Sequence, residues 1–118
     1  MILFTKRSKA AAPIGVTIKG TGGENVCYAI INGTRYTSAA TGIEVMPGDT
    51  ILFGIRGYAL ELLGFYGYVK IDGTEVLKQT TGYFATYEWN VPGDITSIAI
   101  KLYIGGSNAF GQITVTTS

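Results

Sequence analysis

Apolar and polar residues alternate along most of the chain, and this period of two predicts β-strands. Across 83–91 the odd positions are Tyr, Ala, Tyr, Trp and Val, and the even positions are mostly polar. We therefore expect a half-buried strand with its odd face, Tyr83 included, turned inward. Residues 97–104 alternate in the same way, and near the end of the chain Ile113 and Val115 alternate with Gln and Thr.

Shorter apolar or alternating runs between turn residues predict the remaining strands. They cover 15–19, 25–31, 42–45, 50–56, 65–71 and 74–78. No long window carries a helical stripe, and only 59–63 could form a single helical turn, which is too short to stand alone. The pattern predicts an all-β protein, an antiparallel β-sandwich of about 8–9 strands.

Specific turn chemistry separates these strands. Asn32-Gly33 and Asp72-Gly73 each lie between apolar runs. They predict two-residue hairpins, because both central residues of a type I′ turn need positive φ. Pro47-Gly48 and Pro92-Gly93 predict type II turns, with Pro presetting φ at the second position and Gly taking positive φ at the third. The aspartate after each Pro-Gly is expected to cap its turn through a side-chain hydrogen bond.

A short repeat connects the two hairpins. Tyr28–Thr34 aligns with Tyr68–Thr74 in the pattern Y-x-x-I-[N/D]-G-T, offset by 40 residues. Each copy is followed by a short strand and then Pro-Gly-Asp, at Pro47 and at Pro92. The repeat predicts two related halves that stack as a sandwich, each sheet covering the apolar face of the other. Gene duplication and independent use of the same turn chemistry both explain it.

The charges divide the chain into an arm and a domain. The net charge is +1, but from residue 14 onward six basic residues stand against eight acidic ones, so the body carries −2. We therefore expect residues 1–13 to be a short basic arm before a β-sandwich domain at 14–118. The arm is either a frayed tail or a segment that docks on a partner. Its candidate contact residues are three apolar anchors and three cations: Ile2, Leu3, Phe4, Lys6, Arg7 and Lys9.

The composition excludes several classes of function. The 118 residues include no His and one Cys, Cys27, so the usual general base and the usual zinc ligands are missing. We expect Cys27 to be a buried, inert thiol. The carboxylates are scattered, and we expect no catalytic, cofactor-binding or metal site and no enzymatic activity. The balanced charge argues against nucleic acid as a partner, and no run of 18 apolar residues could cross a membrane.

Aromatic residues are the better indication of function. Tyr66 and Tyr68 share parity with Lys70, and Phe84 lies opposite in parity to Tyr83, so we expect Tyr66, Tyr68 and Phe84 to face outward. Exposed aromatics with few charges are typical of a contact surface for protein or carbohydrate. The loop 58–65 adds Leu60, Leu62 and Leu63, which would either plug one end of the sandwich or form an adhesive patch.

Four stretches of the sequence carry a resemblance to a known family. They are Val16–Gly20, Cys27–Thr34, Pro47–Ile51 and Gly111–Thr117. Together they resemble small Ig-like β-sandwich proteins encoded among the head and tail structural genes of tailed bacteriophages. The spacing of I-N-G-T and P-G-D-T is also similar to small repeat modules on bacterial surface proteins.

The phage resemblance implies an Ig-like sandwich with a non-enzymatic role in the virion. The first expectation is a capsid decoration protein, made in the host cytoplasm and bound to the capsid lattice in many copies. Its partners would be the major capsid protein or other virion proteins, with a homo-oligomer or a surface glycan as further candidates. The alternatives are a tail or neck adhesion protein, or a carbohydrate-binding module that uses Tyr66, Tyr68 and Phe84 as a stacking platform.

Overall fold

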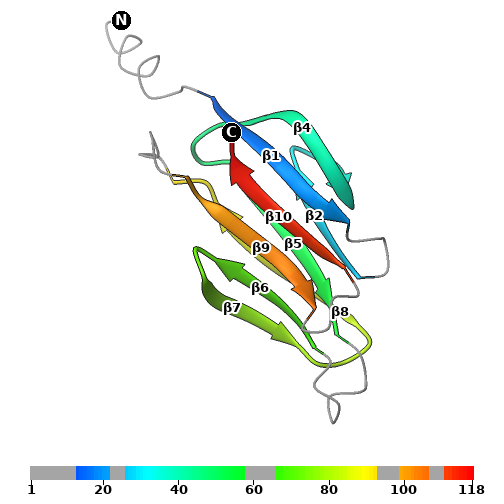
Figure 1. Cartoon of the computed structure of the whole chain (residues 1–118). Coiled ribbons are helices and arrows are strands. Elements are labelled where there is room, and N and C mark those ends of the chain that lie inside the picture. The colour runs from blue at the N-terminus through cyan, green and yellow to red at the C-terminus, as the bar shows by residue number, and fades with distance from the viewer. Residues whose placement is uncertain (1–12, 22–25, 58–65, 93–98, 107–110) are drawn as a thin grey trace, which may run out of the picture.

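The computed structural model describes residues 13–21, 26–57, 66–92, 99–106 and 111–118, and within these ranges the chain is all-β, with no helix (Figure 1). The strands in these ranges are β1 (Ile14–Thr21), β2 (Cys27–Ile31), β3 (Thr34–Tyr36), β4 (Ser38–Val45), β5 (Thr50–Arg56), β6 (Gly67–Ile71), β7 (Thr74–Gln79), β8 (Phe84–Asn90), β9 (Lys101–Gly106) and β10 (Gln112–Thr117).

The strands form two sheets. The larger sheet has the order β4-β1-β10-β9-β6-β7 and the smaller one the order β3-β2-β5-β8, and neighbouring strands in both are antiparallel. In Figure 1 the six-stranded sheet lies in front of the four-stranded one. The expectation of an antiparallel β-sandwich is confirmed, with ten strands in the described ranges.

Three details of the structure differ from the expectations. The short strand β3 was not expected, and β4 begins at Ser38 rather than at Gly42. Tyr83 was expected to face inward but is 81% exposed. It precedes β8 in a bend, where the Gln79 Nε2 donates to the Tyr83 carbonyl oxygen at 2.6 Å. Because Tyr83 is not held in the sheet ladder, the alternation of β8 does not fix the direction of its side chain.

The predicted turns are confirmed where the structure describes them. Asn32 and Asp72 both have φ of 51°, and each is followed by a glycine with positive φ, as a type I′ hairpin requires. At Pro47-Gly48 the Asp49 N–H donates to the Met46 carbonyl oxygen at 3.0 Å. The Asp49 Oδ2 accepts from the Met46 N–H at 2.8 Å, so this aspartate does cap its turn. Gly93, and with it the second Pro-Gly turn, lies outside the described residues.

The sequence repeat has a structural counterpart, but neither half makes up a whole sheet. In the first half β2 and β3 form a hairpin, β4 crosses to the other sheet, and β5 returns to pair with β2. In the second half β6 and β7 form the hairpin, β8 crosses, and β9 returns to pair with β6. The expected stacking of one half on the other is therefore wrong. The strands β4 and β8 are exchanged, so each sheet contains strands from both halves.

The registers of the two halves also correspond. Tyr28 of β2 lies opposite Gly54 of β5, and Tyr68 of β6 lies opposite Gly105 of β9. Two residues further along, Ile30 pairs with Leu52 while Lys70 pairs with Tyr103. The pairing of β2 with β5 and the pairing of β6 with β9 thus repeat one backbone frame, once on each sheet. The two copies carry different side chains on their outer faces.

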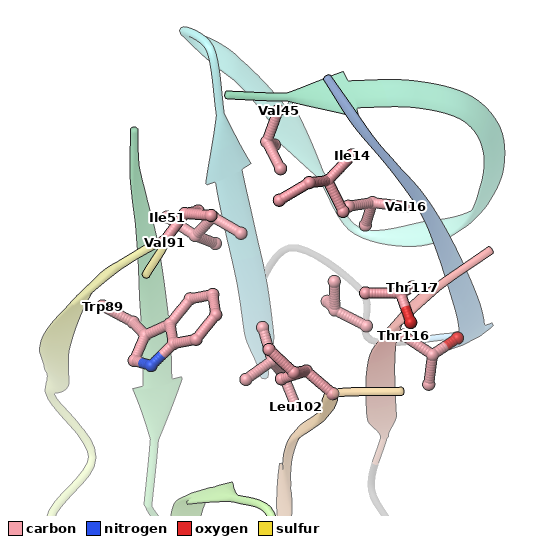
Figure 2. A pocket seen from close by; sticks show the side chains of 11 residues that line it. Ile14, Val16, Val45, Ile51, Trp89, Val91, Leu102, Thr116 and Thr117 are labelled. Atoms are coloured by element: carbon pink, nitrogen blue, oxygen red, sulfur yellow. The ribbon is translucent and has the colours of Figure 1, made fainter. Parts of the chain in front are cut away.

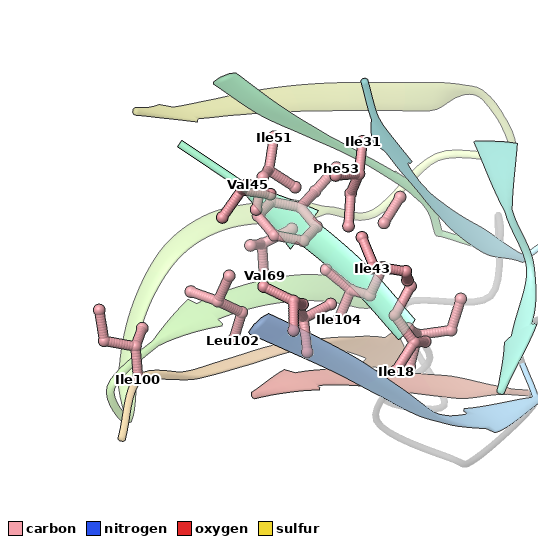
Figure 3. Close-up of a cluster of buried hydrophobic side chains, with 14 of the residues drawn as sticks. Ile18, Ile31, Ile43, Val45, Ile51, Phe53, Val69, Ile100, Leu102 and Ile104 are labelled. Atoms are coloured by element: carbon pink, nitrogen blue, oxygen red, sulfur yellow. The ribbon is translucent and has the colours of Figure 1, made fainter. Parts of the chain in front are cut away.

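Inward-facing side chains of both sheets form one apolar core (Figure 3). Phe53 of the four-stranded sheet is fully buried, and so is Ile104 of the six-stranded sheet. The predicted inward positions in β9 and β10 are confirmed: Leu102, Ile113 and Val115 are all buried. No polar or charged side chain in the described ranges is buried, so hydrophobic burial is what holds the two sheets together.

Two predicted segments lie outside the described residues. They are the arm, apart from Pro13, and the loop 58–65 with its three leucines. The structure therefore describes the sandwich that begins at Ile14. It does not test the predicted anchor in the arm or the predicted plug in the loop 58–65.

Candidate functional site

A row of tyrosines lies on the outer face of the six-stranded sheet. In β6 the buried Gly67 and Val69 alternate with Tyr68, which faces outward as predicted. Its ring lies 5.7 Å from that of Tyr66 and 5.4 Å from that of Tyr103 on β9, centroid to centroid. These tilted contacts are in the favourable range for aromatic pairs, so the rings hold one another in place.

Tyr68 and Tyr103 line a hollow of about 310 Å³ together with Lys70, Gly73 and Lys101. The hollow is shallow and opens to solvent on the side of the sheet away from the core. Its volume is at the lower end of the range of small-molecule sites. We call it the tyrosine–lysine hollow.

The cations of this region lie close to the rings. The Lys70 ammonium is 4.9 Å from the centroid of the Tyr68 ring, and the Lys78 ammonium is 4.5 Å from that of Tyr66. Both distances are within the range in which a ring face attracts a cation. Lys70 also pairs across the strands with Glu75 of β7 on one side and with Tyr103 on the other.

Lys101 is positioned by the second hairpin turn. Its backbone carbonyl oxygen accepts from the Asp72 N–H at 3.0 Å, and its backbone N–H donates to the Asp72 Oδ1 at 3.3 Å. This pair of hydrogen bonds connects β9 to the β6–β7 turn, at the end of the hollow where Gly73 lies. The carboxylate of Asp72 is therefore used to hold the backbone of Lys101.

The phenol of Tyr68 is kept neutral. Burial, followed by a side-chain hydrogen bond with Tyr103, raises its pKa from 10.0 to about 12. The nearby Lys70 opposes this effect by favouring the phenolate. At neutral pH the Tyr68 hydroxyl is therefore a hydrogen-bonding group of a side chain that lines the hollow together with Tyr103.

The outer face of the four-stranded sheet is different in chemistry. One row across it reads Arg35, Ile30, Leu52 and Glu88, each opposite the next on β3, β2, β5 and β8. Ile30 and Leu52 alternate with buried residues, so they point away from the core and are only half-buried. In this row two apolar side chains therefore lie between a charged residue on either edge strand.

Tyr28 and Phe84 extend this apolar centre. Their ring centroids are 5.4 Å apart, and the Arg35 guanidinium lies 4.0 Å from the centroid of Tyr28. Phe84 faces outward as predicted and is 37% exposed. We call Tyr28, Ile30, Leu52 and Phe84 the apolar patch.

The expected stacking platform of Tyr66, Tyr68 and Phe84 is wrong as a single surface. Tyr68 belongs to the six-stranded sheet and Phe84 to the four-stranded one, so their outer faces point in opposite directions. The odd or even position of a residue in a strand indicates whether its side chain faces outward. It does not indicate to which of the two sheets the strand belongs.

A small apolar cavity lies between the sheets near the start of β1 and the end of β10 (Figure 2). Its volume is about 20 Å³, and Trp89, Val45 and Leu102 are among its lining residues. It has about the volume of one water molecule but no polar lining beyond two threonines, so we treat it as a packing gap.

Several residues of these surfaces were not singled out from the sequence. In the hollow they are Lys70, Lys101 and Tyr103, and in the apolar patch Tyr28, Ile30 and Leu52. Ile30 and Leu52 had a usable signal, because each lies in a continuous apolar run that must present apolar side chains to both faces. Lys101 and Tyr103 are joined to Tyr68 only by sheet pairing. The predicted arm residues Ile2, Leu3, Phe4, Lys6, Arg7 and Lys9 lie outside the described residues.

Within the described ranges no three His, Cys, Asp or Glu side chains gather as metal ligands would. The same part of the chain holds no helix of the length and hydropathy that crossing a membrane requires. Comparison with protein families, with curated proteins and with solved structures finds no match to this chain.

Proposed function

We propose that the chain is a non-enzymatic structural protein of a tailed-phage virion, in the first place a capsid decoration protein that binds the capsid lattice in many copies. The proposal rests on the resemblance of its turn and strand motifs to small phage sandwich proteins. The observation that supports it is the apolar patch, because Ile30 and Leu52 direct aliphatic side chains away from a core that is already complete.

Leaving the apolar patch in water costs free energy, because its aliphatic and aromatic side chains stay hydrated. A protein surface that buries aliphatic and aromatic side chains at its centre, with charges at its rim, gains most of its binding energy from the central residues. Arg35 and Glu88, on opposite edge strands, would give the contact its orientation. A lattice that repeats the complementary surface would then recruit one copy of the protein at each site.

The basic arm is the second contact of the proposal. Ile2, Leu3 and Phe4 would anchor in the lattice, while Lys6, Arg7 and Lys9 would pair with acidic groups there. Deletion of residues 1–12 leaves the whole sandwich from Ile14 onward in place. We expect the truncated protein to fold with an unchanged melting temperature but to be absent from purified virions.

The test is the copy number of the protein in purified virions of the phage whose genome encodes it, measured by quantitative mass spectrometry. We expect many copies in the wild type and a strong loss for Leu52→Thr and for Ile30→Thr, each of which places a β-branched residue, suited to a strand, at its position. Loss of a central apolar anchor costs about 2 kcal/mol of binding, roughly thirtyfold in affinity.

The matched control is Gln112→Thr, which introduces the same residue at an exposed strand position on the other sheet. It should leave the copy number unchanged. Absence of the wild-type protein from virions contradicts the proposed function. Equal incorporation of all three variants contradicts the role of the apolar patch. Antibody labelling in electron micrographs then separates capsid from tail or neck, the alternative positions.

A further inference from the structure

The tyrosine–lysine hollow combines two aromatic rings, two phenolic hydroxyls and two ammonium groups in one small solvent-facing depression. We propose that it binds an acidic saccharide, a pyranose unit that carries a carboxylate. The hollow lies on the face opposite the apolar patch, so this inference does not rest on the proposed function in the virion.

The internal repeat shows that the fold does not require this chemistry. Lys70 and Tyr103 occupy the register positions that Ile30 and Leu52 occupy in the other sheet. The neighbouring tyrosine–glycine pair is the same in both. Because the same frame accepts aliphatic side chains in one copy, the lysine and the tyrosine in the other are not needed to form the sheet.

The rings supply a surface for the C–H face of a sugar. Tyr68 and Tyr103 are tilted by 34° to one another at a centroid distance of 5.4 Å, and both line the hollow. A tyrosine offers an apolar body together with a polar tip. The ring faces would pack on the pyranose while the hydroxyls bond to its hydroxyl groups.

The charges select an acidic sugar over a neutral or basic one. Among the residues that the structure describes, the charged ones that line the hollow are Lys70 and Lys101. Glu75 lies across from Lys70 on the β7 side, away from β9, and Asp72 accepts a hydrogen bond from the Lys101 backbone. A carboxylate between the two ammonium groups would make charge-assisted hydrogen bonds, which are stronger than neutral ones.

The hollow is also organised before any ligand arrives. The two rings pack on one another, and the turn hydrogen bonds position the backbone of Lys101. Only the lysine side chains must become ordered on binding. Little conformational entropy is lost when a site is preorganised in this way.

The first experiment measures which compound binds and where it binds. The full chain, labelled with ¹⁵N, is titrated with tetragalacturonate, with the neutral galactotetraose and with polyglutamate, which has carboxylates but no pyranose ring. We expect tetragalacturonate to bind at least about tenfold more tightly than either control. Its chemical-shift changes should cluster on Lys70, Lys101 and Tyr103 and spare Ile30 and Leu52.

Variants then assign the contacts. Tyr103→Ala removes one ring and should weaken tetragalacturonate binding by roughly fivefold. Lys70→Gln and Lys101→Gln should each weaken it by a similar factor and reduce its dependence on salt. Lys19→Gln is the matched control, because Lys19 is exposed on the outer face of the same sheet but on β1, two strands away from β9. It should bind like the wild type, and melting curves confirm that each variant is folded.

Any one of four results would overturn the inference. If galactotetraose binds as tightly as tetragalacturonate, the lysine charges do not contribute to selectivity. If polyglutamate binds as tightly, the hollow is a general anion-binding surface rather than a sugar site. Absence of any shift change at millimolar tetragalacturonate, or changes confined to the four-stranded sheet, rules out the hollow itself.

Discussion

The ring of Tyr28 lies directly on Gly54 of the neighbouring strand: a Cβ atom at Gly54 would be 2.1 Å from the Cζ of Tyr28. A glycine inside a strand usually weakens it, because it has no side chain to pack. Here the ring occupies the space of the missing side chain and continues across the sheet to Phe84. On the other sheet, Tyr68 is likewise the register partner of a glycine, Gly105.

We predict that Gly54→Ala destabilises the protein by about 1–3 kcal/mol, because the added methyl group displaces the Tyr28 ring from its contacts. Chemical denaturation measures this loss. In a Tyr28→Ala background the space is empty, so the same substitution should be neutral or stabilising by up to about 1 kcal/mol. An equal cost in both backgrounds would show that the two residues are not coupled.

The first hairpin turn gives a second prediction. Asn32 has a positive φ of 51°, and its Nδ2 donates to the carbonyl oxygen of Glu44 on β4 at 2.9 Å. Asn32→Ala loses this bond and replaces Asn with a residue that tolerates the left-handed region less well, so we expect a loss of about 1–2 kcal/mol. Asn32→Gly keeps the backbone relaxed and should cost less. Thermal unfolding compares them, and an alanine variant at least as stable as the glycine variant would contradict the argument.

The apolar cavity between the sheets predicts opposite effects of the same substitution at two sites. Val45 lines the cavity, whereas Val69 is fully buried and does not. Val45→Ile should fill the gap and stabilise the protein by roughly 0.5–1 kcal/mol. Val69→Ile should overpack the core and destabilise it by about 1 kcal/mol or more. Urea unfolding measures both changes, and effects of the same sign would mean that the cavity does not control the outcome.

The buried thiol predicts a loss of stability at alkaline pH. Burial raises the pKa of Cys27 from 9.0 to about 12, against the opposing effect of a backbone hydrogen bond from Ile113. Above pH 9 the thiol ionises in the unfolded chain but not in the folded one. The contribution of Cys27 is therefore complete below pH 9 and is lost as the pH rises towards 12.

Between pH 9 and 10 the slope should be at most about 1.4 kcal/mol per pH unit, and it should be smaller in Cys27→Ala. This window lies below the ordinary pKa of tyrosine, so Tyr68 contributes little to it. Unfolding followed by circular dichroism at each pH gives the slope. Thiol reagents provide an independent check, because Cys27 should react only as fast as the protein opens. Identical slopes in the two proteins would exclude the thiol as the cause.

Local chemistry made much of this fold predictable. The turns at Asn32-Gly33, Asp72-Gly73 and Pro47-Gly48 were predicted because positive φ is tolerated by few residues, and the strand faces because side chains alternate in a sheet. The same alternation failed for Tyr83, which lies just outside the ladder. The strand β3 was missed because three residues are too few to show a period.

The candidate surfaces were only partly predictable, for a reason of geometry. Tyr68 and Phe84 could be identified as outward-facing, but not as belonging to different sheets. Lys101 and Tyr103 are far from Tyr68 in the sequence and reach it only because β9 pairs with β6. Alternation records which side of a strand faces the core, whereas neighbours across a sheet depend on strand order.

The sequence by itself determined that the chain is an all-β sandwich with two similar hairpins, because periodicity and turn preference are local properties. Only the tertiary structure decided that β4 and β8 cross between the sheets. That crossing places one copy of the repeated frame on each outer face, where Ile30 and Leu52 form an apolar patch and Lys70 and Tyr103 line a hollow. Strand exchange is set by how both sheets bury their apolar faces together, and no local pattern contains that information.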